Sequence, residues 1–595
     1  MAALNGLSVW RALAVVVVLA LGATGCAAPD GTAAGGAASS STPASGAQDA
    51  TVTFKLIALN DFHGQLRPPG SPTRVPVSQG SGQGTANLPT GGAAYLASVI
   101  EQLRARNPLN AVVAAGDLIG ASPLDSALFH DEPTIEALNT MGLEFSSVGN
   151  HEFDEGVDEL RRIQNGGCHP SSAAEESCRR GQFAGARFRY LAANVLDATT
   201  GKPIFPASSL KAFRLPSGRT LNVGFIGAVV RETPDLVVAS GVRNLQFTDE
   251  ADAANAAVPG LRQQGAHAIV LLIHEGGSTA QQVFDDATCP GFRGNLLPIL
   301  DRLDPAISIV VSGHTHNAYV CRRDSRLITS AGSHGRLVTD IDVEVETRSG
   351  KVVSASAHQV AVVNDIAPNP LPERHPTAKR SEAVEDIVRF YASAAAPLTD
   401  RTVASVTADI TRESTRAGES AIGDLIADAQ LAATSSPADG GAQVAFMNRE
   451  GIRADLLART GRITYGEIYA THPFGNALIT LTLTGAQIRE LLEQQWIGGT
   501  ILQVSQGFSY EWIADAPLGS RVNPSSISLN GAAIEPQKQY RVTVNEFLAG
   551  GGDGFKVLRE GTDRQRGVLD VEALEKYLAA NSPVSPPQRT RIRRR

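Results

Sequence analysis

Five short polar clusters, each directly behind an apolar run, constrain the fold of this chain more than any other feature of its sequence. The apolar runs span residues 54–59, 111–115, 145–148, 268–273 and 307–311, and each has the length of a buried strand. Loops at the ends of buried strands are where α/β proteins gather their functional side chains. The pattern therefore predicts an α/β domain in which one site collects the following clusters: Asp61-Phe62-His63, Gly116-Asp117, Gly149-Asn150-His151-Glu152-Phe153-Asp154, His274-Glu275 and Gly313-His314-Thr315-His316.

The length of the chain predicts more than one domain. At 595 residues it exceeds the size at which a single hydrophobic core keeps growing. Apolar residues make up 43% and charged residues 19%, which is typical of a globular protein. The formal net charge of -8 argues against nucleic acid as the principal partner.

The first 26 residues have the layout of a secretory signal. Arg11 precedes the apolar run 12–21, which is too short for a stable membrane anchor. The small residues of Gly22-Ala23-Thr24-Gly25 then lead to Cys26 and resemble the cleavage motif of bacterial lipoproteins. We expect Cys26 to be lipidated, which would attach the protein to a membrane; simple cleavage and full secretion is the alternative. Residues 27–50 are rich in Ala, Gly, Ser and Thr, so they predict a flexible tether on an exported protein.

The other four cysteines predict two disulfides, because an even number of cysteines in an exported protein is usually paired. Three connectivities are possible. We prefer Cys168–Cys178, which closes a short loop, and Cys289–Cys321, which brackets the loop that carries His314.

Changes of composition divide the chain into segments. Strand-like and helix-like stretches alternate over residues 51–365, which predicts the first α/β domain. A proline-rich break and a helical stretch make residues 366–396 a linker. A second α/β domain is expected over residues 397–580, and the basic end, 581–595, is expected to be a disordered tail.

The residue types of the five clusters suit a pair of divalent metal ions. Such a centre needs about eight ligands and a bridging carboxylate. We expect Asp61, His63 and His316 to bind one ion and Asn150, His274 and His314 the other, with Asp117 as the bridge. The mixed nitrogen and oxygen donors suit Zn, Mn, Co or Fe better than Ca.

His151 is expected to act on the substrate rather than on the metals. Asp154, three residues later, can accept a hydrogen bond from its ring and favour its protonated form, as a general acid requires. A water that bridges the two metals would then be the nucleophile. Isolated histidines are more often structural, and we expect this of His130, His169, His267, His358 and His375. For His334 the two interpretations are nearly balanced, since its loop could border the site.

These motifs, in this order, resemble the calcineurin-type metallophosphoesterases, and more narrowly the exported 5'-nucleotidases of bacteria and animals. That family also includes UDP-sugar hydrolases and 2',3'-cyclic-nucleotide phosphodiesterases. The resemblance covers residues 51 to about 580. It implies a four-layer metallophosphoesterase domain, an α+β sandwich, joined by a helix to a second α/β domain that binds substrate. It also implies the same metal ligands and the pair of His151 and Asp154.

The resemblance continues in the second domain. Its motifs are Asn448-x-x-Gly451-Ile452-Arg453, His472-Pro473-Phe474-Gly475-Asn476 and Asn545-x-Phe547-Leu548-Ala549-Gly550-Gly551-Gly552-Asp553-Gly554. The resemblance implies that Phe474 and Phe547 enclose the base and that Asp553 binds the ribose hydroxyls. It further implies a phosphate site at Arg412, Arg416 and Arg453, with Asn448 near the base or sugar.

Two departures from the family pattern stand near these sites. Arg449-Glu450 replaces a pair of small residues, and it could change the preference for base or leaving group. His316 stands where some members have glutamine, which could influence the choice of metal.

The resemblance implies hydrolysis of nucleoside 5'-phosphates to nucleoside and phosphate outside the cytoplasm, with rotation of the second domain delivering the substrate. Hydrolysis of 2',3'-cyclic nucleotides or UDP-sugars by the same site is the nearest alternative, and a sulfur-chemistry hydrolase of the same layout is another. A surface lipoprotein that binds nucleotides without turnover ranks below them, because the metal ligands and His151 are all present.

Overall fold

The computed structural model describes residues 51–595 except 78–84, 171–175, 281–287 and 347. The described residues belong to one compact unit. The predicted signal, the tether and Cys26 lie outside them. In the part of the chain that is described, no helix combines the length and the apolar character needed to cross a bilayer.

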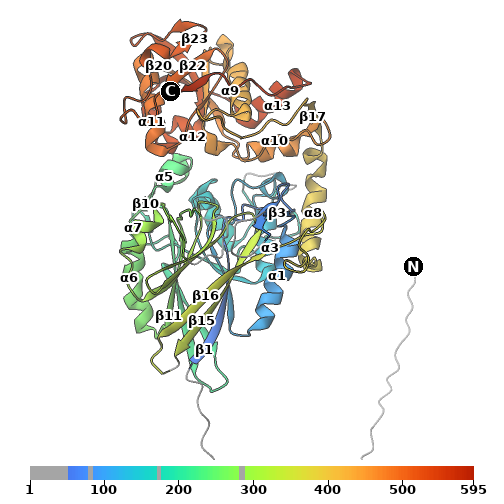
Figure 1. The fold of residues 1–595 in the computed structure, drawn as a ribbon, viewed down its shortest axis with the longest axis vertical. Helices are drawn as coiled ribbons and strands as arrows, with labels where there is room; N and C mark the ends of the chain where they lie inside the picture. The colour runs from blue at the N-terminus through green and yellow to red at the C-terminus, as the bar shows by residue number, and fades with distance from the viewer. Residues whose placement is uncertain (1–50, 78–84, 171–175, 281–287, 347) are drawn as a thin grey trace, which may run out of the picture. The chain divides into compact units, whose positions relative to one another are not determined.

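The first domain contains two six-stranded sheets (Figure 1). The first sheet has the order β16 (Val352–Ala361), β15 (Leu337–Glu346), β1 (Thr51–Leu59), β4 (Asn110–Ala115), β5 (Leu143–Ser147) and β6 (Arg189–Leu191). The second has the order β13 (Ala318–Arg323), β14 (Arg326–Ala331), β12 (Ile307–Ser312), β11 (Ala268–His274), β9 (Thr220–Val229) and β8 (Ser208–Arg214). Two small antiparallel pairs, β2 (Thr73–Pro76) with β3 (Thr85–Leu88) and β7 (Val195–Asp197) with β10 (Leu245–Phe247), are the other strands described in this domain.

Both faces of the central strands of each sheet are buried, which explains the continuous apolar runs. In β1, Leu56 belongs to the core between the two sheets, whereas Ile57 faces the outer core of the first sheet. In β11, Leu272 belongs to the core between the sheets and Leu271 to the outer core of the second. Alternate residues of a strand point to opposite faces, so each run supplies two cores.

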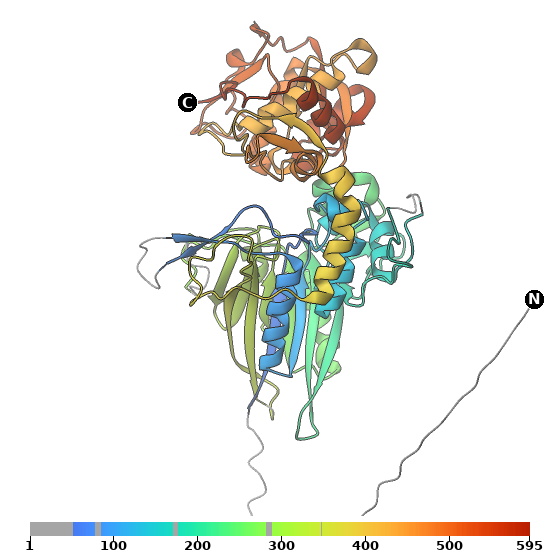
Figure 2. The same ribbon diagram turned by 90° about the vertical axis from the view of Figure 1, so that its right-hand side faces the viewer.

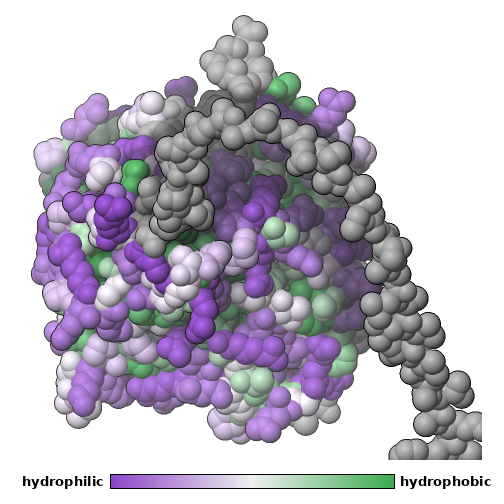
Figure 3. Space-filling model, turned by 90° about the horizontal axis from the view of Figure 1, so that it is seen from below, coloured by the Kyte–Doolittle hydropathy of each residue, from purple (hydrophilic) through white to green (hydrophobic). Residues whose placement is uncertain are grey.

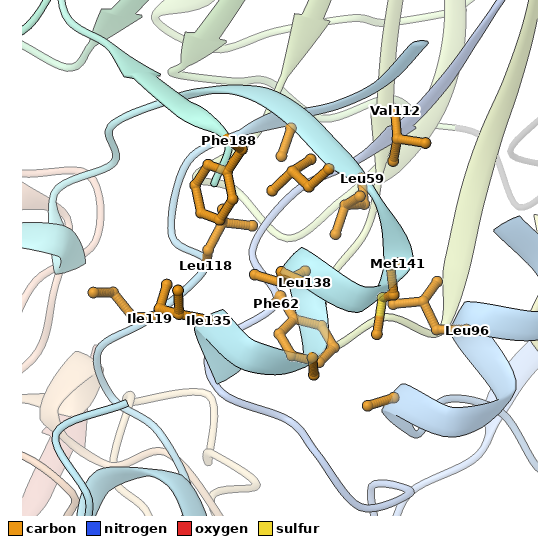
Figure 4. Packing of buried hydrophobic residues seen from close by; sticks show 14 of the residues in the cluster. Leu59, Phe62, Leu96, Val112, Leu118, Ile119, Ile135, Leu138, Met141 and Phe188 are labelled. Atoms are coloured by element: carbon orange, nitrogen blue, oxygen red, sulfur yellow. The ribbon is translucent and has the colours of Figure 1, made fainter. Parts of the chain in front are cut away.

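Helices cover the outer face of each sheet, which makes a four-layer sandwich. α1 (Ala93–Arg106), α3 (Glu132–Met141) and α4 (Val157–Asn165) pack on the first sheet, and α6 (Glu250–Gln263) and α7 (Leu296–Leu300) pack on the second. Figure 4 shows Phe62, Leu138 of α3 and Leu118 among the side chains packed in the first of these outer cores. Phe62 is the apolar residue between Asp61 and His63, so its burial here fixes that polar cluster at the end of β1. The shorter helices of this domain are α2 (Leu124–Ala127) and α5 (Thr233–Leu236).

α8 (Glu382–Thr399) links the two domains (Figure 2). It packs on α1, α2 and α3 of the first domain and touches α10 (Tyr465–Thr471) of the second. Val384, Ile387, Val388 and Tyr391 form its buried face. Figure 3 shows a mainly hydrophilic surface on the face seen from below, with apolar residues scattered over it.

The second domain is built on a five-stranded sheet. Its order is β21 (Gln503–Val504), β18 (Val444–Met447), β25 (Gln539–Asn545), β20 (Ala477–Thr484) and β26 (Thr562–Leu569). The apolar residues of β18 divide between two cores, with Phe446 in one and Met447 in the other. The remaining elements of this domain are α9 (Ala421–Thr434), α11 (Gly485–Gly498), α12 (Glu546–Ala549), α13 (Asp570–Ala580), β17 (Thr402–Ser405), β19 (Arg462–Thr464), β22 (Phe508–Trp512), β23 (Ser528–Leu529), β24 (Ala532–Ala533) and β27 (Ile592–Arg594).

The prediction of a disordered tail over residues 581–595 is wrong. Strand β27 pairs in parallel with β22, and Ile592 is buried. Arg591 donates hydrogen bonds to both carboxylate oxygens of Asp428, at 2.7 and 2.8 Å. Buried carboxylates far away in the sequence therefore give this basic segment partners, which local composition could not reveal.

Two disulfides are present, Cys168–Cys178 and Cys289–Cys321, in the connectivity preferred from the sequence. The first closes the loop that follows α4. The second ties the segment before α7 to strand β13, close to the loop that carries His314 and His316.

Candidate active site

The five polar clusters meet at one edge of the sandwich. Strands β1, β4 and β5 run parallel in the first sheet, as do β9, β11 and β12 in the second. Their carboxyl ends therefore lie together, and the clusters follow them. The donor atoms form three overlapping groups, and within each group one donor atom of every residue lies within 4.8 Å of the others. The groups are Asp61, His63 and His316; His63, Asp117 and His151; Asp117, His274 and His314.

The separations between donor atoms match ligands that share an ion. Nε2 of His63 lies 3.0 Å from Nε2 of His316, which in turn lies 3.2 Å from Oδ1 of Asp61. Asp117 Oδ2 lies 3.0 Å from His274 Nε2 and 3.7 Å from His63 Nε2. Donors that bind one zinc-sized ion at roughly 2.0–2.2 Å lie about 3–3.5 Å from one another, so these contacts fit a metal centre.

Asp117 occupies the position between the two groups that a bridging ligand requires. Its Oδ1 accepts a hydrogen bond from the backbone N–H of His151 at 2.9 Å. Its Oδ2 is the atom that faces both His63 and His274. Although burial alone would raise it, the pKa of this carboxyl is held well below its usual value by the charges of His274 and His151.

Backbone carbonyls fix the histidine tautomers that ligation needs. Nδ1 of His63 lies 2.9 Å from the carbonyl oxygen of Gly120, and Nδ1 of His274 lies 2.8 Å from that of Ala115. A carbonyl can only accept, so both Nδ1 atoms carry a proton, and the Nε2 atoms, which face the cluster, are the ones that would bind an ion. On the other side of the centre, Nδ1 of His314 lies 3.0 Å from Oδ1 of Asn150.

The backbone at the site is strained. Asp61, His63, Asp117, His314 and His316 all have positive φ angles, between 48° and 69°. Residues other than glycine seldom adopt this conformation, and such strain gathers at functional sites. The packing is equally close, since a side chain on Gly149 would place its Cβ 2.1 Å from Oδ1 of Asp117. The chain thus holds its donor atoms together against local preference, which indicates a built site.

His151 stands at the rim of this cluster. It begins a 3-10 turn, His151–Phe153, and its Nδ1 lies 2.8 Å from Oδ2 of Asp154. Burial lowers the pKa of His151, but Asp154 and Asp117 outweigh burial and raise it above its usual value. His151 can therefore donate a proton from Nε2 while Asp154 orients its ring.

Two neighbours of the predicted ligands support the site from behind. The carboxylate of Glu152 accepts hydrogen bonds from the backbone N–H groups of Asp117, Leu118 and Gly149. Asn60 donates to Oδ2 of Asp61 at 2.6 Å and to the carbonyl oxygen of Gly332 at 2.7 Å. The sequence-based prediction gave neither residue a role. Each is the immediate neighbour of a predicted site residue, and that adjacency is the signal by which both could have been found.

His334 also borders the site. Its ring centroid lies 5.8 Å from that of His63 and 5.6 Å from that of His316. Its backbone N–H donates to the carbonyl oxygen of Asp61 at 2.7 Å. The structure therefore favours the interpretation that this loop forms part of the site's wall.

A cavity of about 300 Å³ joins this cluster to the second domain. Its wall includes Asp117, His151 and His314, and it also includes Arg453, Phe474, Phe547, Asn448, Glu450 and Asp553. The ring of Phe474 stacks on that of His151 and lies under the guanidinium of Arg453, 5.9 Å away. Asn448 donates a hydrogen bond to Oδ2 of Asp553 at 2.8 Å. Burial raises the pKa of Asp553 to about 6.

Arg412 and Arg416 do not line this cavity. Both are exposed, and Arg412 pairs with Asp455 at 3.1 Å. The charge of Arg412 nevertheless reaches the site, because it contributes, after burial, to lowering the pKa of His334 and of Arg336. Of the three arginines expected at the phosphate, the structure brings only Arg453 to the cavity.

Comparison with known proteins agrees with this geometry. Residues 54–318 match the family model of calcineurin-like phosphoesterases, and residues 398–560 match that of the 5'-nucleotidase C-terminal domain. A 5'-nucleotidase precursor from Thermus thermophilus has the same fold, with a TM-score of 0.69 and 25% identity over 91% of this chain and 99% of its own. The chain is a calcineurin-like phosphoesterase by fold and site. Because it also carries the second domain, it belongs to the 5'-nucleotidase family.

Two relatives are larger than the present chain. The endonuclease YhcR of Bacillus subtilis is 30% identical over 548 residues, which are 91% of this chain and 41% of that protein. The cell wall protein Lmo0130 of Listeria monocytogenes is 31% identical over 543 residues, 86% of this chain and 65% of that protein. The chain therefore spans less than two thirds of the length of either.

Proposed function

We propose that this protein hydrolyses phosphate esters of nucleotides outside the cytoplasm, releasing nucleoside and phosphate from nucleoside 5'-monophosphates. The cavity that combines the donor cluster with Phe474, Phe547 and Asp553 carries the proposal. A nucleotide presents a phosphate at one end and an aromatic base at the other, and this cavity offers complementary groups to both.

The donor set fits two divalent ions, with Asp61, His63 and His316 for one, Asn150, His274 and His314 for the other, and Asp117 for both. Ions held there would acidify a water molecule as nucleophile and neutralise charge on the phosphoryl group. The nitrogen-rich donors suit Zn, Mn, Co or Fe.

Residues of the chain itself would position the substrate and move a proton. Arg453, in the cavity wall, would bind phosphate oxygens with its planar guanidinium. His151, held by Asp154, would donate its Nε2 proton to the leaving oxygen or stabilise a phosphoryl oxygen. One carboxylate oxygen of Asp553 accepts a hydrogen bond from Asn448. The other oxygen would accept a hydrogen bond from a ribose hydroxyl.

Phe474 and Phe547 would enclose the base from two sides. Gly552 supports Phe547, since a Cβ at that position would approach its ring to 2.4 Å. Because the metal ligands and the aromatic rings lie on different domains, substrate entry would require the domains to separate and close again, with α8 as the connection.

Hydrolysis of phosphodiesters is the second candidate. His316 also lines a second hollow of about 260 Å³, together with Arg74 and Arg336. A monophosphate would not need it, whereas a substrate that continues beyond the scissile phosphate could extend into it. The endonuclease named among the relatives adds support. 2',3'-Cyclic nucleotides and UDP-sugars are small members of the same substrate class.

We also propose an extracytoplasmic location, which the two disulfides and the relative named as a cell wall protein support. Attachment through a lipid on Cys26 is the finer form of this proposal. Metabolic labelling with a palmitate analogue would test it, with Cys26→Ser as the control that should lose the label.

A substrate panel distinguishes the two candidates. The purified, metal-loaded protein is incubated with AMP, UMP, ADP, ATP, UDP-glucose, 2',3'-cyclic AMP, bis-p-nitrophenyl phosphate and a short single-stranded oligonucleotide. We expect the highest kcat/KM for a 5'-monophosphate. A preference for the diesters of about tenfold or more, equivalent to roughly 1.4 kcal/mol, would favour the second candidate, with Arg336→Gln expected to reduce diester but not AMP hydrolysis. No turnover of any substrate would contradict both.

A further inference from the structure

A second cluster of metal-binding residue types lies outside the candidate active site. It contains His130, Glu155 and His169, and one donor atom of each lies within 4.8 Å of the others. The sequence alone predicts that both histidines are structural, because isolated histidines are more often structural than ligating. The fold brings them together across 39 residues of sequence, so their chemistry has to be considered jointly.

The donor atoms are close to the separations found around a single ion. Nδ1 of His130 lies 3.0 Å from Oε2 of Glu155. The two imidazole rings are stacked, with centroids 4.0 Å apart and planes inclined by 7°. Nε2 of His169 lies 4.0 Å from Oε2 of Glu159, which offers a fourth donor. Shifts of about 1 Å would bring such a set to bonds of roughly 2.0–2.2 Å, the range for zinc with nitrogen and oxygen ligands.

Separately anchored segments hold these side chains in place. His130 follows α2 in a turn where its φ is 50°. His169 is adjacent to Cys168, which the disulfide to Cys178 fixes. Glu159 lies in α4, and Glu155 lies just before that helix. A set of donors held by a helix, a disulfide and a strained turn is preorganised, which reduces the entropy that ligation would cost.

The charge of the cluster suits a divalent cation. Arg162 is the cationic neighbour, and it is bound by Glu159 at 2.6 Å and by Glu132 at 2.8 Å. Two carboxylates, those of Glu132 and Glu159, thus bind the one guanidinium, and a third, that of Glu155, lies against His130. With both imidazoles neutral, two negative charges are left over, which one divalent ion would balance.

The cluster is also accessible. The side chains of His130 and His169 are 17% and 20% exposed, and that of Glu155 is 49% exposed. An ion can therefore reach the donors from solvent, while the imidazole rings remain mostly shielded. This combination is suited to reversible binding.

We propose that His130, Glu155, His169 and Glu159 form a third metal site, which binds a divalent ion of the zinc class separately from the dinuclear centre. Its position gives it a role. Glu155 directly follows Asp154, whose carboxylate holds His151. An ion on Glu155 would tie the turn that carries His151 and Asp154 to the α2–α3 connection and to the disulfide loop. The site would thereby act as a positioning device for the catalytic pair, not as a part of the reaction.

Metal stoichiometry tests the proposal without reference to activity. The full chain is equilibrated with zinc at one buffered free concentration, and bound zinc is counted by mass spectrometry of the elements. We expect three ions per chain in the parent protein, two in His130→Gln/His169→Gln, and three in the control His358→Gln, whose histidine is exposed. Equal stoichiometry in the parent and the double variant would overturn the proposal and leave an ion-paired, stacked histidine cluster.

A second variant guards against misfolding. Glu155→Gln alters a half-exposed side chain at the surface and should leave the circular dichroism spectrum unchanged. With cobalt as the probe, we expect the Kd of the weakest of the three ions to rise by about tenfold or more in Glu155→Gln, as is typical when a group that supports a metal site is lost. An unchanged Kd in a folded variant would contradict a role for this carboxylate.

Discussion

The ring of Phe474 stacks on that of His151, with centroids 5.7 Å apart and planes inclined by 19°. One residue belongs to the expected base clamp of the second domain and the other to the candidate catalytic pair of the first. Their contact places the aromatic end of the cavity directly beside the donor cluster. Both the binding and the turnover of substrate should therefore depend on Phe474.

Replacement of Phe474 by alanine should impair binding of the base. Stacking of a base on an aromatic ring is worth about 1–3 kcal/mol, so the KM for AMP should rise roughly 5- to 150-fold in Phe474→Ala. Phe474→Tyr keeps the ring and should stay within about threefold of the parent, a margin of well under 1 kcal/mol. If Phe474→Ala bound AMP as tightly as the parent, the ring would be structural. Steady-state kinetics on both variants decides this.

Replacement of His151 should reduce turnover without loss of metal. A positioned general acid contributes about 10²- to 10⁴-fold to the rate, and we expect kcat to fall in this range in His151→Ala. Asp154→Asn should have a smaller effect in the same direction, because the ring stays but loses its orienting carboxylate. Metal content is measured alongside, and a variant that lost its metals would point instead to a role in ligation.

Glu450 should limit the number of phosphates that the cavity accepts. Its carboxylate is part of the cavity wall, as is Arg453, so its negative charge would repel additional phosphates. In the family pattern this position holds a small residue. Removing its charge in Glu450→Gln should increase kcat/KM for ADP and ATP relative to AMP by about tenfold, as expected for loss of a like charge worth roughly 1.4 kcal/mol. Arg449 is outside the cavity wall, so Arg449→Gln is the matched control and should leave this ratio unchanged. An identical ratio in both variants would argue against a role for Glu450.

The ordered C-terminus leads to a prediction about pH. Burial raises the pKa of Asp424 to about 9, with Arg591 opposing the shift and the charges of Glu419 and Asp428 adding to it. The folded state thus keeps a proton that the unfolded state releases near its ordinary pKa of about 4, so the free energy of unfolding should fall as pH rises from about 4 to about 9. Asp424→Asn cannot ionise, so its Tm should exceed that of the parent slightly near pH 5 and by much more near pH 8.5.

Asp428→Asn is the contrasting variant for that measurement. It weakens the two hydrogen bonds from Arg591 and should lower Tm by about 5 °C or more at either pH, because one partner of a largely buried ion pair is lost. A lower Tm of Asp424→Asn than of the parent at the alkaline pH would show that Asp424 is ionised and paired with Arg591 instead.

The sequence is informative wherever the site follows from strand order. Asp61, Asp117, Asn150, His274 and His314 each follow or end a buried parallel strand, so their convergence could be predicted from the apolar runs alone. Contacts between loops that are distant in the sequence could not be predicted in this way. Arg591 meets Asp428 across 163 residues, and His334 reaches His63 from a loop whose path depends on the whole first sheet.

The same limit applies to the second domain and to the proposed third metal site. The resemblance implies a phosphate-binding role for both Arg412 and Arg453, yet only Arg453 lines the cavity. Arg412 forms an ion pair with Asp455 on the surface instead. His130 and His169 have no shared motif, and their contact arises only in the folded chain.

Phosphate release from AMP tests the proposed hydrolysis at the metal cluster without intermediate assumptions. The metal-loaded protein, the same protein after treatment with a chelator, and His151→Ala are compared at equal concentration. We predict release that the chelator abolishes, that added Mn²⁺, Co²⁺ or Zn²⁺ restores, and that His151→Ala reduces by about 100-fold or more. Release that survives complete removal of metal, or no release by a protein shown to hold two metal ions, would contradict this function.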